Sequence, residues 1–132
     1  MGRNSGGGIK SNRGYSSQER KFIAYVKSEV AKLVPQMKAS YENDWKYVDA
    51  YTTKNLEANV QAMKKFGSDP LGQFIKEQIK KERSGEFKKG YMIRTDPSDF
   101  YMSKSIEFTA RRVASLSFLP RFEAELKKRK KQ

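Results

Sequence analysis

The chain of 132 residues contains no cysteine and no histidine. Their absence excludes disulfide bonds, thiolate or imidazole zinc sites, and serine or cysteine nucleophiles that depend on a histidine base. Long hydrophobic runs are also missing. No apolar run approaches the roughly 18 residues needed to cross a bilayer, so we expect no membrane span. The basic residues near the N-terminus are not followed by a hydrophobic stretch, so we expect no secretory signal.

Positive charge and aromatic side chains are present in excess. Lys and Arg number 28 against 15 acidic residues, which gives a net charge of +13 and a pI of about 9.9. Such an excess favours a polyanionic partner, with nucleic acid first and an anionic membrane surface second. The alternative is a basic protein without a specific partner. Aromatic residues reach 12% although hydrophobic residues total only 36%, which indicates a core built from a few large side chains.

Hydrophobic periodicity predicts an all-α fold, a small bundle of five or six short helices. Ser16 and Glu19 have the spacing of a capping box, and apolar residues recur behind them at steps of three and four. Pro35 predicts a break or a kink, and Gly67 predicts a helix end. Further helical spacing covers residues 37–51, 56–66, 71–83, 103–118 and 122–126. In the fourth of these segments Ser103 or Ser105 is the expected helix start.

Three parts make up the predicted domain organisation. Residues 1–15 hold five glycines and no periodic pattern, which indicates a flexible basic arm. Residues 16–126 form a single helical domain, and residues 127–132 form a basic tail. Within the domain, glycines and a proline punctuate residues 84–102, so we expect a long loop with at most a small hairpin.

The positive charge is concentrated at both ends of the chain and in one internal segment. Residues 1–15, 64–94 and 121–132 carry net charges of +3, +5 and +4, whereas residues 35–62 carry −1. This segregation suits a phosphate-binding surface, because each neutralised phosphate releases a counterion. The candidate nucleic-acid-binding residues are Arg3, Lys10, Arg13, Lys76, Lys80, Lys81, Arg83, Lys88, Lys89, Lys127, Lys128, Arg129, Lys130 and Lys131.

Few residues remain for catalysis. Asp96, Asp99 and Glu107 are the acids near the long loop, and a Mg²⁺-dependent nuclease or toxin would have to use them. Glu107 and Arg111 lie four residues apart on one predicted helix, so an intrahelical ion pair is the simpler explanation. No glycine pattern fits a phosphate-binding loop. We therefore predict no catalytic residue, no metal site, no cofactor and no enzymatic activity.

The stretch FYMSKSIEFTARRVAS resembles a short motif of the large polyvalent protein-associated domains of phages and mobile elements. There a tyrosine-rich turn and a cap precede a helix with a glutamate, followed three residues later by Ala-Arg. The matching positions here are Tyr101, Ser103, Glu107, Ala110 and Arg111. The opening MGRNSGGGI is also similar to the Gly-Arg-Ser openings of phage-encoded accessory and head-associated proteins.

This resemblance implies a phage or prophage origin, and a packing role for Glu107 and Arg111 in place of catalysis. Some relatives of the motif follow a zinc-peptidase helix, but the absence of histidine removes that implication here. Arg112 stands where relatives tend to be apolar, which predicts that its side chain is exposed.

Charge and resemblance together predict a non-enzymatic, phage-type accessory or virion structural protein in the virion or the host cytoplasm. Its basic ends would contact nucleic acid, with DNA favoured over RNA, or neighbouring protein subunits. The alternatives are an RNA-binding, ribosome-like assembly protein and the nuclease or toxin described above.

Overall fold

A computed structural model describes residues 14–85 and 100–131 of the chain. Within these ranges the elements are α1 (Ser17–Trp45), the 3₁₀ turn η1 (Val48–Ala50), α2 (Thr53–Lys65), α3 (Pro70–Arg83), α5 (Phe100–Leu116) and α6 (Leu119–Lys130). The described residues include no strand, and the all-α prediction is confirmed. No helix in them combines the length and hydrophobicity of a membrane-spanning segment.

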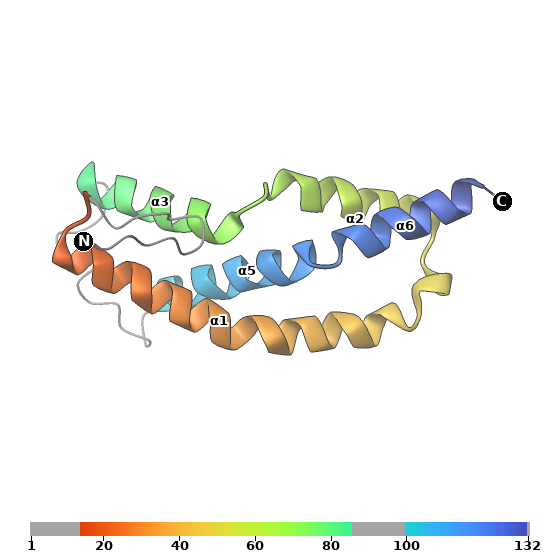
Figure 1. The fold of residues 1–132 in the computed structure, drawn as a ribbon, viewed down its shortest axis with the longest axis horizontal. Helices are drawn as coiled ribbons and strands as arrows, with labels where there is room; N and C mark the ends of the chain where they lie inside the picture. The colour runs from red at the N-terminus through yellow and green to blue at the C-terminus, as the bar shows by residue number, and fades with distance from the viewer. Residues whose placement is uncertain (1–13, 86–99, 132) are drawn as a thin grey trace, which may run out of the picture.

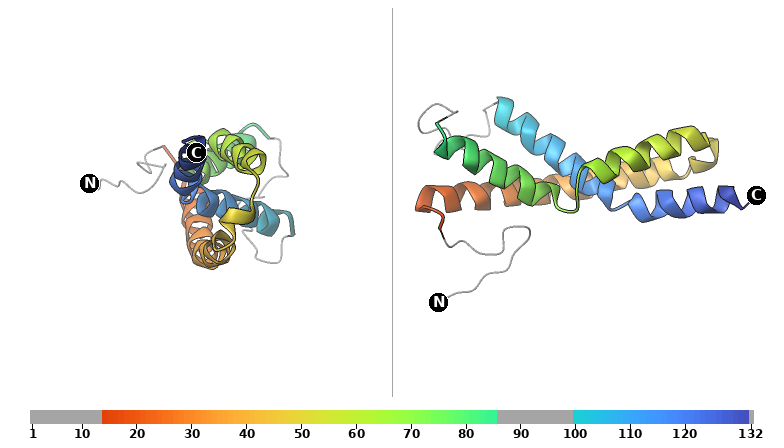
Figure 2. Two further views of the ribbon diagram at one scale, coloured as in Figure 1. Left: turned by 90° about the vertical axis from the view of Figure 1, so that its right-hand side faces the viewer. Right: turned by 90° about the horizontal axis from the view of Figure 1, so that it is seen from above.

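The helices form three long rods that lie side by side (Figure 1). α1 is one rod. α2 and α3 follow one another along the second rod, and α5 and α6 follow one another along the third (Figure 2). With 29 residues, α1 is roughly 43 Å long at about 1.5 Å per residue. Its N-terminal half lies beside α3 and α5, and its C-terminal half lies beside α2 and α6.

Two separate hydrophobic clusters follow from this arrangement. The first core joins α1, α3 and α5, and contains Phe22, Ile23, Val26, Val30, Ile75, Ile79, Met102, Ile106 and Ala110. The second core joins α2 and α6, and contains Leu56, Val60, Met63, Phe118, Phe122 and Leu126. Tyr41 and Trp45 of α1 pack against the second core while remaining partly exposed. The aromatic side chains therefore bridge the space between α1 and this core.

Local signals set most of the helix ends. Ser16 accepts a hydrogen bond from the Glu19 amide, and the Glu19 carboxylate accepts one from the Ser16 amide, so the predicted capping box forms. Asp69 caps α3 in the same way, accepting from the Gly72 amide at 3.0 Å. Gly67 has a φ of 79°, the left-handed backbone that favours glycine after a helix.

The predicted boundaries differ from the structure at two helix ends and at Pro35. α1 continues through Pro35, and Figure 1 shows a bend near its middle, which agrees with the predicted kink and not with the predicted break. A proline inside a helix costs about 3 kcal/mol, but here apolar side chains pack against a core on both sides of it. α5 begins at Phe100, earlier than Ser103 or Ser105. α6 continues to Lys130, so most of the expected basic tail is helical. The expected hairpin falls mainly on residues 86–99, outside the described residues.

Candidate nucleic-acid interface

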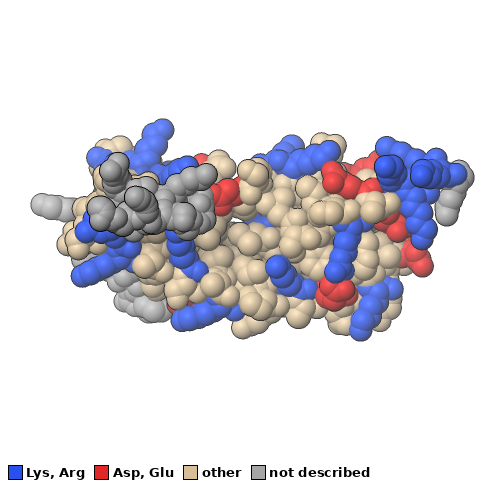
Figure 3. Space-filling model, in the orientation of Figure 1, with Lys and Arg blue, Asp and Glu red and all other residues tan. Residues whose placement is uncertain are grey.

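The end of α6 carries a dense group of exposed cations. The group consists of four lysines within five consecutive positions: Lys127, Lys128, Lys130 and Lys131. Their side chains form no ion pair within the described ranges. Figure 3 shows blue side chains gathered over this end of the molecule. The negative end of the helix dipole favours cations there, which offsets part of their mutual repulsion. We call these four residues the α6 lysine surface.

Arg129 lies in the same run but has a different role. Its side chain is only 17% exposed and pairs with the 12% exposed carboxylate of Glu125, with Nε 3.0 Å from Oε2. Its guanidinium also donates to the carbonyl oxygen of Tyr51 at 2.7 Å and to that of Val48 at 3.0 Å. Arg129 therefore holds the turn around η1 against α6, and its hydrogen-bonding groups face the protein.

A second group of cations lies on α3. Lys76, Lys80 and Lys81 are exposed and have no ion pair within the described residues. Lys76 and Lys80 line a shallow groove of about 410 Å³ together with Tyr15 and Arg83. The groove therefore lies beside Tyr15, where the described chain begins. α3 and the end of α6 occupy opposite ends of the molecule in Figure 1.

Arg83 joins the start of α1 to the end of α3. Its Nη2 lies 2.7 Å from Glu19 Oε1 and its Nε lies 2.8 Å from Glu19 Oε2, a two-point contact. The same guanidinium donates to the Gly14 carbonyl oxygen at 2.8 Å and lies 5.5 Å from the centre of the Tyr15 ring. The structure pairs the Arg83 guanidinium with Glu19 and leaves the side chain 51% exposed, so its assignment to the binding surface stays a prediction.

The Arg83 contact predicts a pH dependence of stability. Hydrogen bonds from Arg83, followed by that from the Ser16 amide, lower the pKa of Glu19 below its ordinary value of 4.5, against an opposing effect of burial. A carboxylate with a lowered folded-state pKa stabilises the fold above about pH 4.5, and that stabilisation is lost as pH falls toward the folded-state pKa. We expect Glu19→Gln to lower the urea midpoint at neutral pH, and we expect its difference from wild type to shrink as pH falls below about 4.5.

Glu57→Gln is the matched control, because Glu57 is exposed and has no ion pair within the described residues. We expect it to leave the urea midpoint unchanged at neutral pH. An equal decrease in the urea midpoint of both variants would show that the contact between Glu19 and Arg83 does not specifically stabilise the fold.

Several predicted site residues lie outside the described residues. These are Arg3, Lys10, Arg13, Lys88 and Lys89, together with the loop acids Asp96 and Asp99. Tyr101 lies in the first turn of α5, but its side chain is not described. Among the described residues, no group of three acidic side chains is placed to hold a metal ion.

The resemblance motif lies on α5, as expected, but its ion pair differs. Ser103 is exposed, and Glu107 pairs with Lys104 at 3.2 Å, so the predicted Glu107–Arg111 pair is wrong. The side chain one turn toward the N-terminus is the one that reaches the carboxylate. Arg111 and Arg112 are exposed, which confirms the expectation for Arg112, and Arg112 lies 5.2 Å from the centre of the Phe66 ring.

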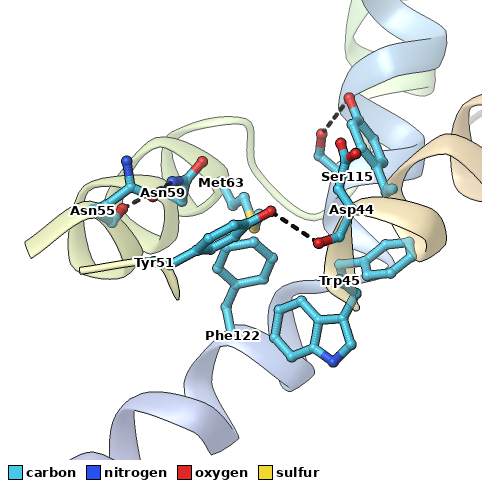
Figure 4. A pocket seen from close by; sticks show the side chains of 10 residues that line it. Asp44, Trp45, Tyr51, Asn55, Asn59, Met63, Ser115 and Phe122 are labelled. Atoms are coloured by element: carbon cyan, nitrogen blue, oxygen red, sulfur yellow. Dashed lines mark hydrogen bonds between the residues drawn. The ribbon is translucent and has the colours of Figure 1, made fainter. Parts of the chain in front are cut away.

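A cavity of about 250 Å³ between α1, α2 and the α5–α6 junction is not anticipated from the sequence. Its lining consists of Tyr41, Asp44, Trp45, Tyr51, Asn55, Asn59, Met63, Ser115, Phe118 and Phe122 (Figure 4). The aromatic residues indicate a core by their spacing, and the pair Asn55–Asn59, four residues apart on one helix, is the polar signal that sequence reasoning missed.

Comparison of the chain with models of protein families, with curated proteins and with solved structures gave no match. The resemblance to the phage-associated motif therefore stays a prediction.

Proposed function

We propose that this protein binds nucleic acid without enzymatic activity, with the α6 lysine surface as its principal contact and the α3 lysines as a second contact. Duplex DNA is the favoured ligand. The phage-type accessory or virion role belongs to the same proposal and depends on the motif resemblance. The alternative partner is a neighbouring protein subunit, which would have to present an acidic face to the same lysines.

One observation supports the proposal above the others. Four lysines sit within five residues at the end of α6, all exposed and all without an ion pair within the described residues. Structural salt bridges engage the nearby arginines, since Arg121 pairs with Glu42 and Arg129 with Glu125, but they leave these lysines available. Ammonium groups clustered in this way contact phosphates without reading base sequence, and they make binding strongly dependent on salt.

Replacing the four lysines of the α6 lysine surface by glutamine tests the proposal. We expect binding to a nonspecific DNA duplex, measured by fluorescence anisotropy at low salt, to weaken at least 100-fold. The plot of log affinity against log salt should lose about one unit of slope for each lysine that contacts a phosphate. Full-length protein is used, and circular dichroism verifies that the variant remains helical.

A charge-matched control separates a local surface from general electrostatics. Glutamine at the exposed lysines Lys21, Lys38, Lys46 and Lys54 removes the same total charge from other parts of the molecule. We expect a loss of less than tenfold for this control. An equal loss of DNA affinity in the α6 lysine variant and in the control would contradict the proposal. So would the absence of salt-dependent DNA binding by the wild type. Tighter binding to a structured RNA hairpin than to the duplex would favour the RNA-binding alternative.

A further inference from the structure

The cavity near the middle of the molecule has an aromatic wall. The rings of Trp45 and Phe122 have their centres 5.1 Å apart at an angle of 50°, and those of Tyr41 and Phe118 lie 5.8 Å apart, edge to face. These four residues, which we call the aromatic wall, line the cavity together with Tyr51. The face of an aromatic ring in such a lining suits the face of another flat ring.

The opposite side of the cavity carries a polar edge on α2. Figure 4 shows Asn55 and Asn59 across from Trp45. The Asn59 amide nitrogen donates to the Asn55 backbone oxygen at 2.8 Å and to Asn55 Oδ1 at 3.1 Å. These bonds leave the Asn55 amide N–H groups as donors and Asn59 Oδ1 as an acceptor. Adjacent amide donors and acceptors are what proteins use to read the edge of a nucleobase.

Charge and size narrow the class of ligand further. The lining contains no lysine or arginine, and its one acidic residue, Asp44, disfavours an anion. The cavity is therefore unsuited to a phosphate or a carboxylate. Its volume of about 250 Å³ lies below the usual range of about 300–1,000 Å³ for drug-sized ligands, which suits a single ring system.

We propose that this cavity binds a nucleobase, stacked on the aromatic wall and held at its edge by Asn55 and Asn59. A free nucleoside and an unpaired nucleotide of a strand present the same heterocycle, and in either case any phosphate stays outside. The inference rests on the cavity alone and does not require the α6 lysine surface to bind DNA.

Trp45 provides the measurement, because it is the single tryptophan of the chain and lines the cavity. Adenosine, guanosine, cytidine and thymidine are titrated separately into the full-length protein while tryptophan fluorescence is followed. Salt at about 0.5 M suppresses contacts to the exposed lysines. We expect saturable quenching by at least one nucleoside, and at least fivefold weaker binding in Asn59→Ala. Asn59 is only partly buried, so this variant should remain folded.

Gln61→Ala is the matched control, since Gln61 lies on α2 but lines a different groove. We expect nucleosides to quench its tryptophan fluorescence with the same affinity as in the wild type. A single-stranded oligonucleotide and an abasic strand of equal length then separate the two sources. Quenching by the base-containing strand alone assigns the cavity to an unpaired nucleotide, whereas quenching by nucleosides assigns it to the free ligand.

Three results would overturn the inference. The first is no quenching by any nucleoside or by the base-containing strand. The second is unchanged affinity in Asn59→Ala. The third is quenching by tetramethylammonium alone, which would reassign the cavity to ammonium ligands. Loss of DNA binding by the α6 lysine variant leaves the nucleoside titration unaffected, so failure of the proposed function and failure of this inference are distinguishable.

Discussion

Replacement of Phe22 by alanine is expected to lower the free energy of unfolding by about 3–5 kcal/mol. Phe22 has no exposed surface and is one of the largest fully buried side chains of the molecule. The substitution removes the transfer free energy of the ring and leaves a cavity where α1 meets α3 and α5. Small domains are stable by only about 5–15 kcal/mol, so a loss of this size should be clear in a urea titration followed by circular dichroism.

Phe108→Ala is the matched control, because it removes the same side chain from an exposed position on α5. Phe108 is 60% exposed, and we expect its loss to cost no more than about 0.5 kcal/mol. Similar losses in the two variants would mean that Phe22 is not part of a close-packed core.

Replacement of Arg129 by methionine is expected to lower the free energy of unfolding by about 2–3 kcal/mol. The change leaves the Tyr51 carbonyl without its donor and leaves the Glu125 carboxylate, which is 12% exposed, without its cation. Methionine keeps the apolar part of the side chain, so the loss reports the guanidinium contacts. Thermal and urea unfolding of the full chain measure the effect.

Lys130→Met is the control one position away, on an exposed side chain without an ion pair in the described part of the chain. It should cost at most about 0.5 kcal/mol. For the proposed DNA binding we expect the larger effect from Lys130→Met. Lys130→Met should reduce the salt slope by about one unit if Lys130 contacts a phosphate, whereas folded Arg129→Met should leave it nearly unchanged. A larger salt effect from Arg129 would place its guanidinium on the binding surface.

The features predicted correctly from the sequence are those that depend on neighbouring residues. The capping box of Ser16 and Glu19 and the glycine stop at Gly67 each involve residues within one helical turn. Their chemistry is the same in any tertiary context. The periodicity of apolar residues behind these caps was sufficient to predict the helical class.

The wrong predictions concern features that depend on tertiary packing, such as the course of a helix or the partner of a charged side chain. The helix continues through Pro35 because Val34 and Met37, on either side of it, both pack against the first core, and Tyr41 and Trp45 further along pack against the second. Glu107 had a basic residue available in both directions, and its spacing could not show whether Lys104 or Arg111 would reach it. Local preference sets the candidates in such cases, and tertiary contacts select among them.

For the candidate interface, the sequence shows how many charged residues there are. It does not show which of their side chains are already paired within the protein. Arg83 pairs with Glu19, which is 64 residues away in the chain. Arg129 donates to the carbonyl oxygens of Tyr51 and Val48, which are 78 and 81 residues away. The exposed lysines of α6 have no ion pair within the described residues, so their charge is available to a ligand. The cavity beside Trp45 arises from the spacing between α1 and the second core, which no local pattern encodes.

The second and third rods are interrupted near one another along the molecule, at a level that α1 crosses as a continuous helix. The second rod is interrupted around Gly67 and the third around Phe118, while Tyr41, which contacts Phe118, lies less than two turns beyond Pro35 on α1. Proline cannot donate a backbone hydrogen bond, so even the continuous rod is weakened near this level. Because α1 is the one described helix that crosses this level, a change in the angle between the two lysine-bearing ends would require α1 itself to bend.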